Sequence, residues 1–233
     1  MGRVLTGGGR PLSPLHPGPL VSADELIGPV DVVARSLLGC WVVTERPEGT
    51  AALRLTEVEA YSGSGVDPAA HSHRGPTPRA AIMFGPPGRL YVYFSYGVHW
   101  CANVVVGAEG DGEAVLLRAG ELVVGEEIAR SRRPAARNAR DLAGGPARLT
   151  QALAIGRDDL GTDVLDPGSP VRLHRGSPPA SVSAGPRVGI SVATELPWRF
   201  WETGAPSVSA FRAGGKGRVG RRQSARAGQD GLP

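Results

Sequence analysis

The sequence predicts a compact body of mixed α/β structure, and three observations lead to this fold class. Its 233 residues suffice for one domain with a substantial core, and no linker divides them. Segments with strand-like alternation are interspersed with segments that carry helix caps. No apolar run approaches membrane-spanning length, and the start lacks the apolar core of a signal peptide. We therefore expect one soluble, intracellular domain that acts as a monomer.

The helices are expected at segments with recognisable start and stop signals. Ser22 can cap SADELIG, Pro29 can start PVDVVARSLLG, and Gly39 ends that segment before the strand CWVVTE. Further helices are expected at EEIARSRR and PARLTQALAI, and later strands at VRLHR and RVGISV.

The segment LRLTEVEAY, residues 53–61, has the alternation of a strand. A period of two places Leu53, Leu55, Glu57, Glu59 and Tyr61 on one face. A carboxylate and a flat aromatic ring then share one surface.

A hairpin is expected between LYVYF, residues 90–94, and VHWCANVVV, residues 98–106. The loop between them, SYG, has a glycine where a hairpin needs positive φ, and it places Tyr96 at the tip. A hairpin cannot bury an aromatic side chain at its own tip, and proteins insert such wedges between base steps of a duplex. In the following strand, EAVLLRA, the side chains of Ala114, Leu116 and Arg118 lie on one face. Arg118 thereby adds a fixed positive charge to the predicted site.

All four tyrosines of the chain lie between residues 61 and 96, although only 5% of the residues are aromatic. A hydrophobic core would scatter them, so this concentration indicates a functional site. The surrounding blocks are EVEAY, AAHS, TPR, MF, PG-LYVY-SYG, C-N and VLLRA, followed by GPARLTQALAI, RVGI and PWRF.

In these blocks the chain resembles the alkyladenine (3-methyladenine) DNA glycosylases, which remove alkylated and deaminated purines from DNA. The resemblance extends from about Leu26 to Phe200. It implies a single mixed α/β domain with a curved antiparallel sheet that carries a protruding β-hairpin. It also implies a base-excision repair enzyme whose partner is double-stranded DNA containing damaged purines.

The resemblance assigns the catalytic base to Glu59, the second acid of EVEAY. It assigns Arg118 to holding the nucleophilic water, and a salt bridge from Arg118 to Glu59 or Glu57 is the compatible alternative. Glu57 is expected to be structural. Its distance of ~7 Å along the strand would also suit the carboxylate pair of an inverting sugar hydrolase.

The resemblance also implies a base pocket. Tyr61 is expected on one face of the flipped purine, His71 on the other, and Tyr93 at its edge, with Leu116 in the pocket wall. Asn103 is expected to clash with the 2-amino group of guanine, and its alternative role is a hydrogen bond to a strand edge.

Two residues are expected to intercalate in the DNA. Tyr96 would fill the space left by the flipped base, and Met83 would wedge near the opposite strand. Tyr91 is expected in the core.

The positive charge of the chain is concentrated at its C-terminal end. Residues 212–233 hold six basic residues and one acidic residue, so residues 1–211 carry a formal charge of −1. We expect a disordered tail at 1–20, a glycosylase domain at 21–211 and a basic disordered tail at 212–233. Local phosphate contacts are expected instead from four residues of the domain: Arg74, Thr77, Arg79 and Arg89.

The chain has a single lysine, Lys216, in the glycine-rich tail. A Schiff-base lyase mechanism needs an amine at the site, so water is the expected nucleophile of a monofunctional enzyme. No cofactor is expected, and His71 and His73 have no partner ligands at metal-binding spacing. His73 or a water is a candidate acid for neutral bases.

Two other functions stay open. One is a protein that binds damaged DNA without cleaving it, and the other is a hydrolase of free nucleosides or O-glycosides. The alanine, arginine and glycine bias favours a GC-rich bacterial genome, so we expect a cytoplasmic protein associated with the nucleoid.

Overall fold

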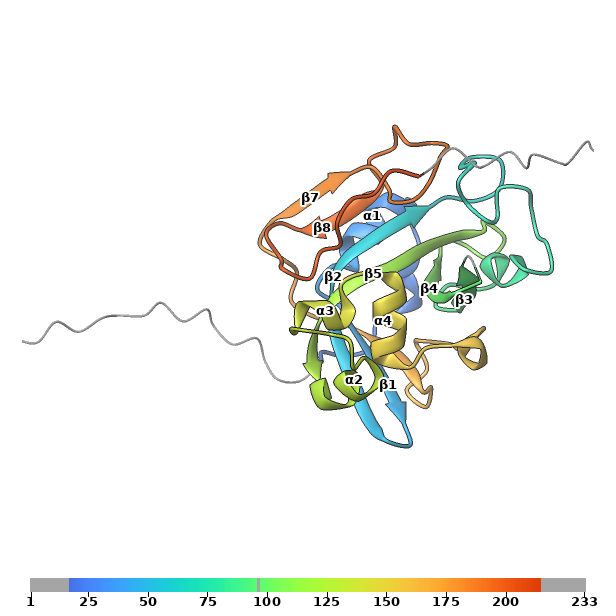
Figure 1. Cartoon of the computed structure of the whole chain (residues 1–233). Coiled ribbons are helices and arrows are strands. Elements are labelled where there is room, and N and C mark those ends of the chain that lie inside the picture. The colour runs from blue at the N-terminus through green and yellow to red at the C-terminus, as the bar shows by residue number, and fades with distance from the viewer. Residues whose placement is uncertain (1–16, 96, 215–233) are drawn as a thin grey trace, which may run out of the picture.

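The computed structural model describes residues 17–95 and 97–214 (Figure 1). The expected fold class is confirmed: the chain forms one mixed α/β body around a curled antiparallel sheet. The described elements are η1 (Ala23–Leu26), α1 (Val30–Ser36), β1 (Trp41–Arg46), β2 (Gly49–Tyr61), η2 (Ala81–Phe84), β3 (Leu90–Ser95), β4 (His99–Val106), β5 (Glu113–Val124), α2 (Glu126–Arg132), α3 (Arg140–Ala143), α4 (Pro146–Leu153), η3 (Arg157–Asp159), β6 (Val171–His174), β7 (Val182–Gly185) and β8 (Arg199–Glu202).

Two long strands, β2 and β5, form the middle of the sheet (Figure 1). The strand order is β3-β4-β5-β2-β1-β6, and β8 adds to β2 while also pairing with β7. Every pairing is antiparallel. Helices α2, α3 and α4 group together in front of the strands, and α1 lies behind them (Figure 1).

The expected helices are present, and their caps explain their bounds. Ser22 and Glu25 form a capping box at η1, which is a single 3-10 turn. Pro146 occupies the first turn of α4, where its missing N–H costs nothing. Gly39, which follows α1, has φ +88°, a conformation that glycine adopts without strain.

The prediction of a strand at RVGISV is wrong. Residues 187–192 form an irregular segment instead. The Val188 N–H donates to the Glu59 side chain rather than to a neighbouring strand, and Gly189 has φ +77°. This segment therefore serves the site and not the sheet.

A β-bulge in β2 changes which residues of LRLTEVEAY share a face. Leu55 pairs with Gly120 and Glu57 with Ala119, so Thr56 is the extra residue on β2. Leu53 and Leu55 consequently face the main core, together with Val58 and Ala60 beyond the bulge. Glu57, Glu59 and Tyr61 share the opposite face, so the expected grouping of the two glutamates with the tyrosine is confirmed and that of the two leucines is wrong.

The β3–β4 hairpin is confirmed. Ser95 pairs with His99 at its end, and Gly97 has φ +67°. Leu90 and Val92 face the main core, whereas Tyr91 faces a second, smaller cluster. That cluster contains the residues Ala80, Met83, Tyr91, Val105 and Ala114.

No helix in the described part of the chain is long and apolar enough to cross a membrane.

Candidate active site

The candidate site lies on the sheet face opposite the main core, where one row of residues crosses four strands. Glu59 on β2 pairs with Leu116 on β5, Leu116 with Asn103 on β4, and Asn103 with Tyr91 on β3. Antiparallel pairing brings these side chains together although they are up to 57 positions apart in the sequence. The expected co-location of Glu59, Leu116 and Asn103 is thus explained by the sheet register.

A cavity of about 640 Å³ opens over this row. A cavity of this volume can hold a small-molecule ligand or a group of similar size. The lining residues that the sequence singled out are Tyr61, His71, Arg79, Met83, Tyr91, Tyr93, Asn103 and Leu116. Residues 188–192 form the wall that the sequence interpreted as a strand.

Glu59 is fully buried beside this cavity. Its Oε1 accepts a hydrogen bond of 2.7 Å from the Val188 N–H, and its Oε2 accepts one of 2.9 Å from the Tyr61 hydroxyl. Arg118 Nη1 lies 3.2 Å from Oε2. Burial raises the pKa of Glu59 above its usual 4.5, and the charge of Arg118 opposes the rise only in part.

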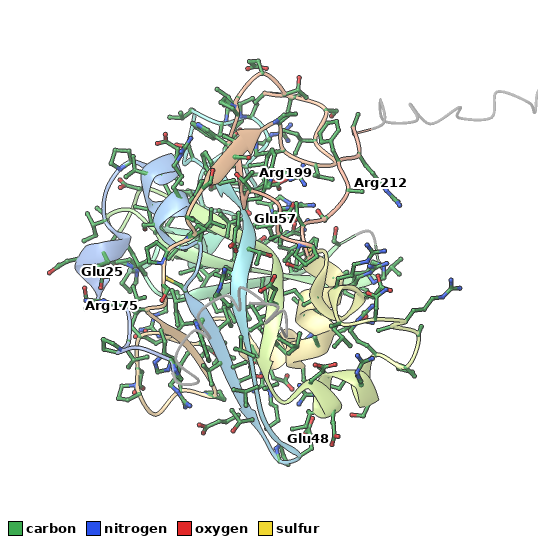
Figure 2. All side chains as sticks on the ribbon, turned by 90° about the vertical axis from the view of Figure 1, so that its left-hand side faces the viewer. Glu25, Glu48, Glu57, Arg175, Arg199 and Arg212 are labelled. Atoms are coloured by element: carbon green, nitrogen blue, oxygen red, sulfur yellow. The ribbon has the colours of Figure 1, made fainter. Side chains whose placement is uncertain are left out.

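Glu57 lies in a denser set of donors. Its Oε1 accepts from Arg118 Nε and Arg199 Nε, both at 2.7 Å, and from the Ser209 hydroxyl at 2.8 Å. The Ser209 N–H donates to Oε2 at 2.6 Å. Burial alone would raise the pKa of Glu57, but the two arginines and the Ser209 N–H outweigh it and lower that pKa below 4.5. Figure 2 shows Glu57 and Arg199 together inside the molecule, whereas Glu48 lies at the end of the β1–β2 hairpin.

Arg118 bridges the two glutamates. Its Nε donates to Glu57, its Nη1 pairs with Glu59, and its Nη2 donates to the Ser209 hydroxyl at 3.1 Å. The predicted salt bridge is therefore present to both carboxylates. A guanidinium held at three of its nitrogens has a fixed orientation.

Tyr61 has different surroundings on its two faces. The Arg187 guanidinium lies 4.6 Å from the ring centroid, and Arg187 does not line the cavity. Arg187 in turn forms a fully buried ion pair with Asp67. The buried cation therefore covers the ring face that points away from the cavity.

His71 and Tyr93 form a second aromatic part of the cavity lining. Their ring centroids lie 4.6 Å apart in an edge-to-face arrangement, and His71 Nδ1 lies 3.0 Å from the Tyr91 hydroxyl. His71 is exposed within the cavity, yet the desolvation by its neighbours and the charge of Arg79 lower its pKa to about 4. The imidazole is therefore neutral at neutral pH. Tyr91 is buried, as expected.

Asn103 makes the strand-edge hydrogen bond that was its alternative role, and it also lies at the cavity. Its Nδ2 donates to the Tyr91 carbonyl at 3.1 Å, which is a bond to the neighbouring strand. It also lines the cavity, as Leu116 does. The bond fixes the amide plane, so Asn103 meets any group in the cavity as a rigid wall.

The two residues expected to intercalate are placed differently. Tyr96 lies outside the described residues, in the loop that joins β3 and β4. Met83 is only 3% exposed and packs with Tyr91 and Val105 at the cavity wall. The structure therefore places Met83 in the pocket and not on the protein surface.

The four residues expected to contact phosphate differ in their surroundings. Arg74, Thr77 and Arg79 are exposed in the loop after β2, and Arg79 lies 5.2 Å over the Tyr93 ring. Arg89 instead donates to the Gly161 carbonyl at 3.3 Å and lies 3.9 Å from Asp163. Arg74 and Arg79 are thus open to solvent, whereas the Thr77 hydroxyl accepts a hydrogen bond of 3.2 Å from the Ala80 N–H and Arg89 has partners within the protein.

Sequence reasoning missed five residues of the site: Asp67, Arg187, Val188, Arg199 and Ser209. The blocks RVGI and PWRF contain three of them, but their spacing from EVEAY gives no sign of contact with it. Among the described residues, no group of three or more histidine, cysteine or acidic side chains could hold a metal ion.

The curled sheet and its aromatic cavity define a protein that can enclose one flat, ring-shaped group beside a buried carboxylate. The chain belongs to the methylpurine-DNA glycosylase (MPG) family, whose model matches residues 24–206. The family expected from the sequence is thereby confirmed.

Three relatives illustrate the similarity, and each is provisionally named a 3-methyladenine DNA glycosylase. The protein of Nocardia farcinica is 50% identical over 199 residues, which cover 83% of this chain and 92% of that protein. The Streptomyces avermitilis protein is 51% identical over 189 residues, covering 79% and 88%. The Mycobacterium leprae protein is 49% identical over 196 residues, covering 82% and 89%.

Proposed function

We propose that this chain is a purine DNA glycosylase of base-excision repair. It hydrolyses the N-glycosidic bond of alkylated or deaminated purines, the class that includes 3-methyladenine, 7-methylguanine, hypoxanthine and ethenoadenine. One observation carries the proposal: a buried carboxylate, Glu59, is held by three donors at the edge of an aromatic cavity. The family membership and relatives about 50% identical support the same reaction.

Glu59 is the proposed general base. Loss of a base from deoxyribose develops positive charge on the sugar, and a carboxylate both deprotonates water and stabilises that charge. A raised pKa increases the proton affinity of the carboxylate, which suits this role as long as the group stays ionised. The cavity reaches Tyr61 and Val188, the two hydrogen-bond partners of Glu59. The attacking water is proposed to approach the carboxylate beside them.

Arg118 is the proposed partner of that base. Its contact with Glu57 fixes the guanidinium, and its charge lowers the pKa of Glu59 against the effect of burial. Positioned in this way, Arg118 can orient the attacking water.

The cavity is proposed to hold the flipped purine. Tyr61 and His71 supply aromatic faces, Tyr93 the edge, and Asn103 with Leu116 the wall that excludes the guanine amino group. Flipping costs a few kcal/mol, and it costs least for damaged or mispaired bases. Stacking at about 1–3 kcal/mol per base returns much of that cost.

The remaining parts of the proposal concern DNA. Tyr96 fills the space that the flipped base leaves in the duplex. Met83 approaches the opposite DNA strand, which requires Met83 to leave its present contacts. Arg74, Thr77 and Arg79 contact phosphates, and Arg89 does so on leaving Asp163. The catalytic domain spans residues 21–211, and the Arg212 carbonyl supports it by accepting from the Gly189 N–H. The protein acts as a monomer in the bacterial cytoplasm and uses water as its nucleophile without a cofactor.

A panel of duplexes with single lesions tests the function under single-turnover conditions. Release of free base without strand cleavage supports a monofunctional glycosylase. Tight binding of lesions with no release supports a non-catalytic damage-binding protein. Release from free nucleosides but not from duplexes supports a nucleoside hydrolase.

A further inference from the structure

Arg187 is among the largest fully buried side chains of the described part of the chain, and it packs against Tyr61, which lines the cavity. Its Nη1 and Nη2 donate to the two Asp67 oxygens at 2.5 and 2.9 Å, and Nη1 also donates to the Ala60 carbonyl at 2.9 Å. The Tyr61 ring centroid lies 4.6 Å from Cζ and the Trp198 centroid 5.4 Å. The guanidinium is thus fixed against the rear of a cavity wall.

The second aromatic wall also has a cation against it. Arg79 Cζ lies 5.2 Å from the Tyr93 centroid, and Tyr91 stacks on Tyr93 at 5.5 Å. His71, which completes this wall, is neutral at neutral pH. Among the described residues, the aromatic lining therefore has two arginines close to it, and only one of them, Arg187, is buried.

An aromatic ring attracts a cation through the negative charge of its faces. A guanidinium fixed on one face polarises the ring toward itself and repels a second cation on the other face. Burial lowers the effective dielectric, so this repulsion is screened less than it would be at a surface. Asp67 accepts two hydrogen bonds from the guanidinium, so its negative charge offsets part of this repulsion.

We infer that the cavity binds uncharged purine bases in preference to cationic ones, and that Arg187 sets this preference through Tyr61. The inference rests on the proposed function and deepens it. Cationic alkylated purines are then released because their glycosidic bonds are weak and not because the cavity binds them tightly. Neutral lesions such as hypoxanthine leave less readily, and the cavity binds them more tightly.

The test replaces the ion pair by two amides, Arg187→Gln with Asp67→Asn, in a Glu59→Gln background that blocks base release. The affinity for one duplex carrying hypoxanthine is compared with that for the same duplex carrying cationic 7-methylguanine. We expect the ratio of the two affinities to shift by about two- to fivefold toward 7-methylguanine, the scale of one exposed cation–π interaction. An unchanged ratio overturns the inference.

A second ion pair supplies the matched control. Arg54 pairs with Glu202 at 2.5 Å, both side chains are mostly buried, and neither lines the cavity. Arg54→Gln with Glu202→Gln loses a comparable pair, so it is expected to leave the ratio unchanged. A shift of the same size in this control attributes the effect to general loosening and contradicts a role for Arg187.

A measurement on the unmutated protein covers the case in which the amide pair does not fold. 1-Methyladenosine and N6-methyladenosine are isomers, and only the first is a cation at neutral pH. We expect N6-methyladenosine to compete more strongly with a hypoxanthine duplex, by about threefold or more. Equal or stronger competition by 1-methyladenosine overturns the inference. Failure of the unmutated protein to release any base would instead overturn the proposed function.

Discussion

Glu57 and Glu59 lie two residues apart on the same face of one strand, and both are fully buried, yet the protein shifts their pKa values in opposite directions. Glu57 has two arginines and Ser209 around it, whereas Glu59 has one arginine, one hydroxyl and one N–H. Neither side chain has solvent-accessible surface, and Glu57 has one more cation beside it than Glu59. Two neighbouring carboxylates thereby acquire separate roles: one is a structural anion and the other is a base.

The largest expected effect on stability comes from removing the Glu57 charge. Glu57→Gln leaves Arg199 in the interior without its anion and leaves Arg118 paired with Glu59 alone. Breaking a buried pair in this way costs about 3–5 kcal/mol. Glu59→Gln is the matched control. It removes one charge whose burial is already unfavourable, so we expect a loss of no more than about 1 kcal/mol. Urea unfolding of both variants measures the difference, and equal losses would contradict the division of roles.

The pH dependence of base release separates the two carboxylates kinetically. Glu59 acts as a base only when ionised, and its pKa is raised, so the rate is expected to fall with acid at a pH above the usual glutamate value of 4.5. The lowered pKa of Glu57 places its protonation below this range. Its contribution to stability is present above the pKa of the unfolded state and is lost as the pH falls through the folded pKa. An acid limb that coincides with acid unfolding would contradict the assignment to Glu59.

A substitution at Ser209 tests the surroundings of Glu57 further, because the Ser209 hydroxyl contacts both Glu57 and Arg118. Ser209→Ala removes these hydrogen bonds and is expected to reduce stability by about 1 kcal/mol. Base release should slow several-fold, since Arg118 loses one of its three anchors. Ser207→Ala is the control: that hydroxyl bonds Thr56 at 2.8 Å and does not contact the glutamates. Equal rates for the two variants would remove Ser209 from the support of Arg118.

The smallest expected effect concerns the basic C-terminal end. The Gly189 N–H donates to the Arg212 carbonyl, so a truncation that preserves the site should end after Gly214 and not after Phe211. Such a truncation removes five basic residues and one acidic residue. We expect unchanged base release and weaker binding of undamaged DNA at low salt, with a shallower salt dependence. An unchanged salt slope would show that this segment does not contact DNA.

The sequence predicts the parts of this site that depend on local periodicity. The alternation of EAVLLRA correctly places Leu116 and Arg118 on one face, and the hairpin follows from β-formers around a glycine. The bulge at Thr56 could not be predicted, because it arises where β2 exchanges β1 for β8 as its neighbour. The same holds for Arg187 and Ser209, whose contacts join segments more than 100 residues apart. The β-branched residues of RVGISV favour a strand, but the Val188 N–H donates to Glu59 and not to a neighbouring strand, so no strand forms there.

The central claim is that Glu59 is the base and that its neighbours serve to hold it. Single-turnover base release from a hypoxanthine duplex by Glu59→Gln tests this claim most directly, together with the affinity of the same variant for that duplex. Glutamine preserves the shape of the side chain but cannot accept a proton from water. We expect binding within a few-fold of the unmutated protein and no measurable base release. Retention of most of the single-turnover rate, in a variant that binds normally, would contradict the account.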